Sequence, residues 1–468
     1  MNNDVKALKS GIWYTAASFL TKSIGLITTP IFTRMLSHAE FGLYSNYQSW
    51  LSILSLVVTL NLGSTFISAR YDYEDRFDEY ILSTLALGTF SVLLWTVVLN
   101  IAYPFIASVL GVERIYLNCM MLYLLMSSAV SMYQTRERYY FEYKKTVLIS
   151  VIISVGTSVV SVILVLLMDN RLAGRIYGSA LPTILTGLVL YNIIVLKGKK
   201  ITLTDWVYAI PICLPFIPHL LSMTILGSVD RIMITNICGE EDNALYSVAY
   251  TCGSLITILI TSMNTAYAPW LGEKLHQDKY NEVRSFSIKY ITAFVYLMLG
   301  AMLLTPEMLM LLGGKSYMAA KTVMPPVTCG VACQFLYTMF VNVEQFKKKT
   351  LGMAIGSMSA ALLNYILNAI FIPRFGYTAA AYTTLFSYLW LLCVHMFLVY
   401  RIGYHHVYDY RFVTTIVGLL LIVTLGVNLL YRSSEMRYVF VVCYIFLSLL
   451  VIYKYGRRIL QYYHDMKR

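Results

Sequence analysis

The chain has 468 residues, of which 58% are hydrophobic and only 13% are charged, and its formal net charge is +12. A soluble domain carries about 25% charged residues, so this composition excludes a protein whose whole surface faces water. The apolar runs last about 20 residues instead of alternating over about ten, which indicates membrane-spanning α-helices and not a β-barrel. The sequence therefore predicts an all-α polytopic membrane protein.

The positive charge does not indicate a nucleic-acid-binding protein. The basic residues cluster in short loops between apolar runs, where they act as topology signals. No basic stripe with interleaved aromatic side chains covers a domain. The eight cysteines form no Cys-x-x-Cys motif and no Cys/His cluster, so neither a metal site nor a disulfide framework is expected.

The apolar runs predict about fourteen spans joined by short connections. The first is expected to remain in the mature protein, because it is longer than a signal-peptide core and has no small-residue cleavage site. Most Lys and Arg residues fall in alternate connections and in both tails, which predicts cytoplasmic termini. The expected spans are residues 11–35, 43–69, 80–110, 115–135, 146–168, 173–196, 207–237, 244–268, 285–311, 322–343, 350–372, 377–400, 411–431 and 437–454.

The second and eighth predicted spans resemble each other. Aligning the chain with itself places Leu43-Tyr44-Ser45 on Leu245-Tyr246-Ser247. The hydroxyl residues that follow recur at the same steps and lie on one helix face. They are Ser45, Ser49, Ser52, Ser55 and Thr59, matched by Ser247, Thr251, Ser254, Thr257 and Thr261. Small hydroxyl residues also pack helices together in membranes, but repetition at one offset favours an internal repeat.

The repeat predicts two lobes of six helices in the same orientation, because an even number of spans separates the copies. Such lobes are related by an axis along the membrane normal, and a substrate site lies between them near the bilayer midplane. We expect one lobe at residues 1–200 and the second at 201–403. Residues 404–468 would add two further spans and a basic cytoplasmic tail.

Three charged residues lie well inside apolar runs: Lys22, Asp230 and Arg231. A charge in the membrane costs at least about 2.5 kcal/mol on insertion scales, so each is expected to face the protein interior or a wet cavity. Asp230 and Arg231 point about 100° apart on a regular helix, and we expect Asp230 to pair with another helix, for example with Lys22. Arg231 would then be free to meet an anion. A purely structural ion pair is the alternative.

The seventh span contains Pro211, Pro215 and Pro218. Interior prolines remove backbone hydrogen bonds and bend or break a helix, so this span is expected to be interrupted. Such a break marks either a mobile element that lines a pathway or a static kink. At the ends of the first two spans, Arg34 and Arg70 are expected at the membrane interfaces, where the planar guanidinium could also guide a diphosphate group.

Several segments in a fixed order resemble the polysaccharide-transport branch of the multidrug/oligosaccharidyl-lipid/polysaccharide exporters, the Wzx-like lipid-linked oligosaccharide flippases. The likeness covers nearly the whole chain. Its segments are residues 29–37 (TPIFTRMLS) leading to 40–44 (EFGLY), the proline-rich seventh span leading to Asp230-Arg231, and residues 364–368 (NYILN) with 372–376 (IPRFG) and the alanines 379–381.

The resemblance implies a flippase that moves an undecaprenyl-diphosphate-linked oligosaccharide from the inner to the outer leaflet of the bacterial cytoplasmic membrane by alternating access. It also implies a cationic cavity for the diphosphate, although Thr224 stands in the second half where Lys22 stands in the first. We expect Asn264 and hydroxyls of the second and eighth spans to contact sugar. The candidate substrate-binding residues are Lys22, Arg231, Asp230, Arg34, Arg70, Asn264, Ser52, Thr59, Ser254 and Thr261.

Two other functions are weighed against the flippase. A cation-coupled drug antiporter of the same superfamily would place carboxylates in the cavity, and a membrane polysaccharide polymerase would need a larger extramembrane loop with catalytic acids. We therefore expect no enzyme activity and no cofactor. Coupling to H+ or Na+ through Asp230 is a hypothesis. The expected partners are the lipid-diphosphate-linked glycan, the bilayer and other polysaccharide-assembly proteins, but not nucleic acid.

Overall fold

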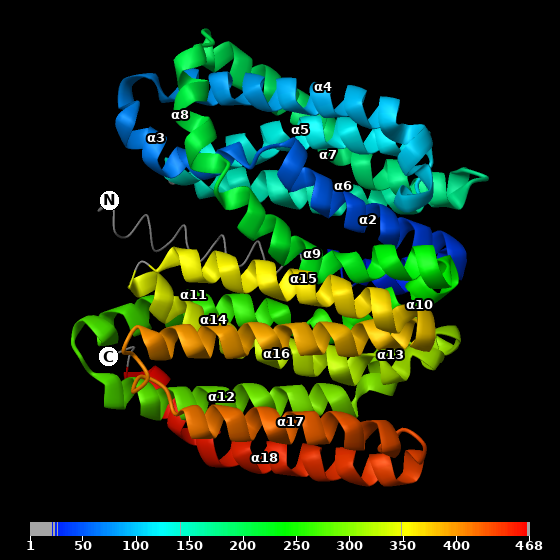
Figure 1. The fold of residues 1–468 in the computed structure, drawn as a ribbon. Coiled ribbons are helices and arrows are strands. Elements are labelled where there is room, and N and C mark those ends of the chain that lie inside the picture. Colours follow the sequence, from blue (N-terminus) through cyan, green and yellow to red (C-terminus); the bar gives the residue numbers. More distant parts are fainter. Residues whose placement is uncertain (1–20, 22–23, 26, 141, 348, 466–468) are drawn as a thin grey trace.

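The computed structural model describes residues 21, 24–25, 27–140, 142–347 and 349–465. Within these residues the ordered backbone is helical, without β-strands (Figure 1). This agrees with the predicted fold class, because a lipid-facing backbone satisfies its hydrogen bonds most simply within each helix. Lys22 lies outside the described residues.

The first group of helices follows a helical segment that ends at Met35. Ser37 and Glu40 form a capping box at the start of the next helix, which fixes that helix end. The elements of this group are α2 (His38–Val58), η1 (Leu62–Thr65), α3 (Phe66–Asp72), η2 (Glu74–Arg76), α4 (Phe77–Leu110), α5 (Arg114–Tyr139), α6 (Tyr143–Leu167) and α7 (Arg171–Gly198).

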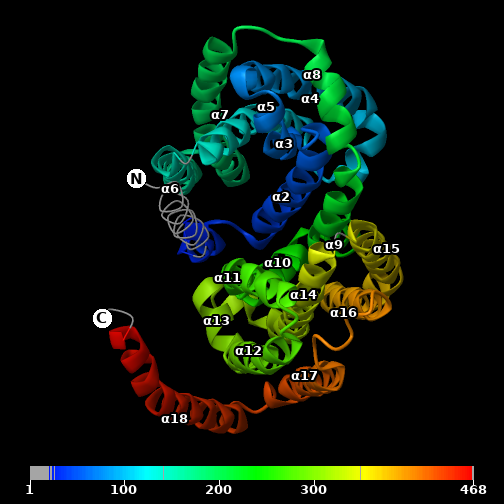
Figure 2. The same cartoon turned by 90° about the vertical axis from the view of Figure 1, so that its left-hand side faces the viewer.

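The second group begins after a short connection. Its elements are α8 (Leu203–Cys213), α9 (Phe216–Cys238), α10 (Glu240–Ser254), α11 (Thr257–His276), α12 (Tyr280–Leu303), α13 (Thr305–Leu312), η3 (Lys315–Thr322), α14 (Met324–Phe346), α15 (Thr350–Phe375) and α16 (Tyr377–Arg401). Two further helices, α17 (Tyr410–Leu430) and α18 (Ser434–Asp465), complete the described chain. Figure 2 shows them beside the second group and away from the first.

Among the described residues, eleven helices are long and apolar enough to cross a membrane. The chain is therefore a multi-pass membrane protein. The count of fourteen spans and the cytoplasmic position of both termini stay predictions. The helices run between two ends of the molecule, seen left and right in Figure 1, which we call the α8 end and the α13 end after the short helices located there.

The predicted interruption of the seventh span is confirmed. The segment forms two helices, because α8 ends at Cys213 and α9 begins at Phe216, with Pro215 between them. The α8 helix packs on the first group through an ion pair of 2.7 Å between Arg76 and Asp205. The α9 helix instead packs against α2, α10 and α15. The break thus lets one span serve both groups.

Each group has apolar clusters of its own. In the first group, one cluster surrounds Phe66 and Tyr80, and another surrounds Tyr47 and Met120. The main cluster of the second group is built mostly from α11, α12, α14, α16 and α17. The division of the chain at residues 200 and 403 stays a prediction, and α8 lies against the first group although it follows residue 200.

The two groups meet most closely at the α13 end, where α2 crosses α10. Gly42 makes this possible, because a Cβ at that position would overlap the carbonyl oxygen of Glu240. Asn243 then donates a hydrogen bond of 2.9 Å to the carbonyl oxygen of Gly42. Nearby, Thr33 donates to the carbonyl oxygen of Leu312 at 2.6 Å. Small residues permit such close backbone packing between membrane helices, and here they close the α13 end.

We predict that Gly42→Ala separates α2 from α10 at the α13 end. The added Cβ meets backbone atoms, which cannot move aside as a flexible side chain would, and overpacking of this kind costs about 1–3 kcal/mol. The expected result is a lower unfolding temperature in detergent and greater accessibility of a cysteine placed at Asn243. Gly418→Ala on α17 is the matched control, because its Cβ meets no atom within 4 Å. Equal behaviour of the two variants would contradict the prediction.

Candidate functional site

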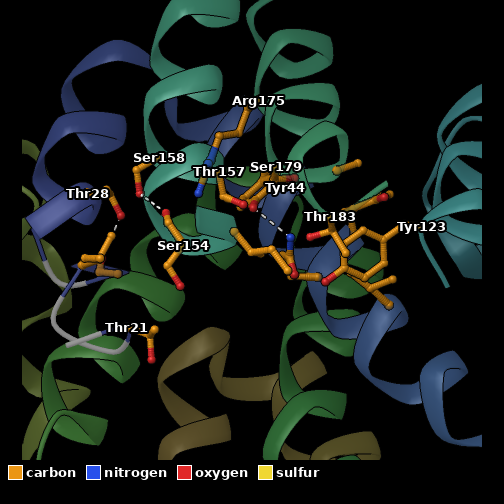
Figure 3. Close-up of a pocket in the computed structure, with 17 residues that line it drawn as sticks. Thr21, Thr28, Tyr44, Tyr123, Ser154, Thr157, Ser158, Arg175, Ser179 and Thr183 are labelled. Atoms are coloured by element: carbon orange, nitrogen blue, oxygen red, sulfur yellow. Dashed lines mark hydrogen bonds between the residues drawn. The ribbon is translucent and has the colours of Figure 1, made fainter. Parts of the chain in front are cut away.

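Two adjoining cavities of about 290 and 280 Å³ are lined largely by polar residues of the first group. One is enclosed by α2, α5, α6, α7 and the helical segment that ends at Met35, and Figure 3 shows its polar lining. The other extends from these helices to α9 and α10, so it lies between the two groups. The residues shared by both linings are Gly25, Thr28, Tyr44, Gln48 and Arg175.

Arg175 of α7 projects into the cavity from its upper side in Figure 3. Its guanidinium carbon lies 3.7 Å from the ring centroid of Phe32 and 4.4 Å from that of Tyr44. One nitrogen, Nη1, donates to Ser161 at 2.9 Å, whereas the buried Nε has no hydrogen-bond partner. Arg175 forms no ion pair with a described carboxylate. A guanidinium stays charged in proteins, so this cation has donors available for an anion.

The sequence around Arg175 explains its position. A Cβ at Gly174 would lie 2.7 Å from the carbonyl oxygen of Leu164, and a Cβ at Gly178 would overlap the backbone of Ser161. These two glycines, four residues apart, allow α6 and α7 to pack backbone against backbone. Arg175 lies next to this contact, and its side chain passes Ser161 into the cavity.

Arg231 of α9 lines the cavity between the two groups. Its guanidinium carbon lies 4.4 Å from the ring centroid of Tyr250, and Nη1 donates to the carbonyl oxygen of Gly227 at 2.9 Å. Among the described residues it forms no ion pair. Arg175 and Arg231 are the charged residues in the described lining of the two cavities, which contains no carboxylate. The cavity is therefore cationic.

The repeated hydroxyl faces meet in this second cavity. Ser45, Ser49 and Ser52 of α2 lie in its lining together with Ser247 and Thr251 of α10. Ser45 and Ser247 are matched residues of the internal repeat, as are Ser49 and Thr251. The N-terminal part of each repeated face thus lines the space between the two groups. Of the four hydroxyl residues selected from the sequence as candidates, Ser52 lies in this lining.

Asp230 lies elsewhere, in a buried network between α9, α10, α15 and α16. Its side chain is 1% exposed, and its carboxylate accepts hydrogen bonds from Tyr246 (2.6 Å), Thr384 (2.6 Å) and Asn368 (2.7 Å). Asn368 also donates to Asn364 at 3.1 Å. Both oxygens of Asp230 are satisfied by neutral donors, so the carboxylate joins four helices instead of lining either cavity.

The remaining candidate residues lie outside the two cavities. Arg34 donates to the carbonyl oxygens of Pro30 and Leu311 at the α13 end. Arg70 lies at the α8 end with its guanidinium 5.3 Å from the ring centroid of Tyr140. Asn264 accepts from Asn342 at 2.7 Å. Three hydroxyls donate to carbonyl oxygens of their own helices, namely Thr59, Ser254 and Thr261.

Arg175 was not selected from the sequence, because it stands close to Arg171 near the start of its span. The Gly174–Gly178 pair is the sequence signal that places it inside, since it indicates a tight helix contact at that depth. The neutral lining was also missed. It comprises Thr28, Gln48, Tyr123, Ser154, Thr157, Ser158, Ser179 and Thr183.

A match of residues 7–274 to the family described as "Polysaccharide biosynthesis protein" now places the chain among known proteins. The chain belongs to the polysaccharide biosynthesis protein family. A relative from Haemophilus influenzae, the Lsg locus putative protein 1, is 23% identical over 290 residues, or 59% of this chain and 68% of the relative. The resemblance found in the sequence is confirmed at the level of the family.

Solved structures of two transporters share the fold. The lipid II flippase MurJ in an inward closed conformation has a TM-score of 0.70 and 14% identity, over 98% of this chain and 100% of that one. A multidrug resistance MATE family transporter of the MOP superfamily, in an inward-facing conformation, has a TM-score of 0.67 and 15% identity, over 83% of this chain and 95% of that one. This member of the polysaccharide biosynthesis protein family therefore has the MOP-superfamily fold.

We predict that Asp230→Ala destabilises the second group of helices. The substitution leaves the donors of Tyr246, Thr384 and Asn368 without their acceptor, at about 1–3 kcal/mol for each buried group that stays unpaired. Thermal unfolding in detergent measures the loss. Asp169→Ala is the control, because Asp169 is exposed and surface substitutions change stability by about 0.5 kcal/mol or less. An unchanged unfolding temperature for Asp230→Ala would contradict the network's structural role.

Proposed function

We propose that this chain is a flippase that moves an undecaprenyl-diphosphate-linked oligosaccharide from the inner to the outer leaflet of the bacterial cytoplasmic membrane by alternating access. The observation that carries the proposal is a cavity with two arginines, Arg175 and Arg231, and no described carboxylate in its lining. The structural relative MurJ is a lipid II flippase, which supports the same class of substrate.

A diphosphate suits the two arginines. Buried cations need a counter-charge, and the nearest deep acid, Asp230, is already occupied by Tyr246, Thr384 and Asn368. The planar guanidinium donates two parallel hydrogen bonds to phosphate oxygens. Aromatic faces at Phe32, Tyr44 and Tyr250 hold the two guanidinium groups without neutralising them. Their charge therefore remains available to a phosphate group.

The neutral part of the lining suits a glycan. Hydroxyl and amide side chains both donate and accept hydrogen bonds, as sugar hydroxyls require. Tyr44 and Tyr123 add ring faces beside these groups. A drug antiporter for organic cations is the weaker candidate, because a cationic ligand would meet two arginines instead of a carboxylate.

The contacts at the α13 end support alternating access. The positive-inside pattern predicts that the α8 end faces the cytoplasm, so the contacts at Gly42 and Thr33 close the outer side. Release to the outer leaflet then requires α2 and α10 to separate there. The break between α8 and α9 gives the span that touches both groups a place to bend.

We predict that Arg175→Ala and Arg231→Ala each lower glycolipid transport about tenfold to a hundredfold. A hydrogen bond to a charged group contributes about 1.5–3 kcal/mol, and each 1.4 kcal/mol is a factor of ten. The measurement is made in the native cell with the gene deleted and each variant returned. The variants should accumulate the diphosphate-linked glycan on the cytoplasmic leaflet and lose surface polysaccharide.

Arg114→Ala is the matched control for these arginine variants. Arg114 is bound to Asn100 at 2.9 Å near the α13 end and lines neither cavity, so its removal should leave transport unchanged. Normal surface glycan in the deletion strain, together with altered sensitivity to cationic drugs, would reject the flippase and favour the antiporter.

We further propose that transport is coupled to an H+ or Na+ gradient. Asp230 is the acid that the sequence singles out, and one variant tests whether it carries the ion. Asp230→Asn preserves the shape of the side chain and removes the charge. If Asp230 carries the coupling ion, transport by this variant should no longer respond to collapse of either gradient. Transport that stays fully dependent on the gradient would exclude the role. Measurement of glycolipid transport with selective ionophores separates the two ions.

A further inference from the structure

A second buried acid lies in the second group of helices, away from both cavities. Glu344 of α14 and His395 of α16 approach to 2.7 Å between Oε1 and Nδ1, and their side chains are 1% and 2% exposed. The ring of Tyr337 stacks on His395 with the centroids 5.6 Å apart. The pair is therefore enclosed by α14 and α16 and has no direct contact with solvent or lipid.

Part of the hydrogen-bonding capacity of this pair is unused. Glu344 Oε2 is buried without a partner, beside the first turn of α15, where a Cβ at Gly352 would lie 3.7 Å from it. The far edge of the imidazole, at Nε2, faces Gly356, whose Cβ would lie 3.2 Å away. A buried polar atom without a partner is rare in native proteins and requires an explanation.

Close to this region, α15 contacts the start of α9 through Ser357 and His219, and His219 lies within electrostatic range of His395. Ser357, which follows Gly356, lies 2.8 Å from His219 Nδ1. Ser357 donates its own hydrogen to the carbonyl oxygen of Ala354 at 2.9 Å, so it accepts from His219. His219 is partly exposed and stands in the first turn of α9, directly after the break at Pro215. His219 therefore stands beside the break between α8 and α9.

Besides His219, which lies within electrostatic range of His395, the other ionisable groups around the pair are tyrosines and lysines, which do not change charge near neutral pH. Tyr337 of α14 and Tyr410 of α17 lie within electrostatic range, and free tyrosine has a pKa of about 10. Lys349 precedes α15 and donates its backbone N–H to the carbonyl oxygen of Glu344 at 2.9 Å. Lys347 lies 4.4 Å from the ring centroid of Tyr404. Histidine and a coupled carboxylate are the groups that exchange protons in this range.

The pair is neutral overall when it holds one proton, on either the carboxylate or the imidazole. Loss of that proton leaves a buried negative charge, and gain of a second leaves a buried positive charge. Either net charge is costly without water or a counter-charge. Proton exchange therefore requires water to enter between α14, α15 and α16. The pair that holds one proton favours close packing of these three helices.

We propose that Glu344 and His395 form the proton-binding site of this transporter, reached from the α8 end through His219 and Ser357. Proton binding at this pair does not depend on the proposed transport function. Only the process that the proton drives rests on that proposal. Loss of the proton would loosen the three helices at the α8 end, and binding would close them again. Both carboxylate oxygens of Asp230 accept hydrogen bonds, so Asp230 lacks an unpartnered oxygen like Oε2 of Glu344.

The first test reads the proton site directly in the purified full chain. Infrared difference spectra are recorded between about pH 5 and about pH 8, the range around the histidine pKa. The wild type is expected to show a carboxylic-acid band that Glu344→Gln removes. Glu307→Gln is the control, because Glu307 is half-exposed and paired with Arg437 at 2.6 Å. A wild-type spectrum identical to that of Glu344→Gln would overturn the proposal.

The second test measures coupling in vesicles with undecaprenyl-diphosphate carrying a fluorescent disaccharide. One coupled proton supports a leaflet asymmetry of up to about tenfold for each pH unit of gradient. Glu344→Gln is expected to abolish the asymmetry while passive exchange of the probe continues, and the control Glu307→Gln to keep it. Should the single variant not fold, Glu344→Gln with His395→Gln restores a hydrogen bond between two amides.

The outcomes separate the two proposals. Full asymmetry with a folded Glu344→Gln variant overturns the proton site and leaves the flippase standing. A wild type that moves no probe rejects the proposed function for this glycolipid, whereas the infrared result still decides whether Glu344 holds the proton.

Discussion

The contact between α2 and α10 holds the two groups of helices in this arrangement. It depends on the absence of a side chain at Gly42, which lets the backbone of α2 approach the carbonyl oxygen of Glu240. Asn243 then binds the carbonyl oxygen of Gly42 and also donates to Thr235 of α9. One small residue thereby brings α2, α9 and α10 together. The cavity with its arginines lies next to this contact.

The distribution of charge follows from the cost of ions in the membrane. The deep acids of the second group have partners away from the cavities: Asp230 accepts three neutral hydrogen bonds, and Glu344 Oε1 lies 2.7 Å from His395 Nδ1. The cations of the cavity, Arg175 and Arg231, are instead held by aromatic faces. Because the acids are buried elsewhere, the cavity keeps a net positive charge and can receive an anionic head group.

Part of the site was accessible from the sequence. Arg231 was selected because it stands inside an apolar run, and Ser52 because its helix face recurs in α10. Asp230 was correctly identified as a deep acid, but its partners come from α15 and α16, more than a hundred residues away, and no spacing rule reveals them. Arg175 was missed because an arginine near a helix start is usually interfacial, and only the packing of α6 on α7 places it inside.

The sequence by itself determined the all-helical membrane fold, the break in the seventh span and the membership of the polysaccharide biosynthesis protein family. These features are local or compositional, because lipid permits few backbone structures and proline interrupts a helix wherever it stands. Only the tertiary structure decided which polar groups face the cavity and which are joined to one another. That choice depends on helix rotation and on contacts between distant segments, and a helical sequence constrains each of these only weakly.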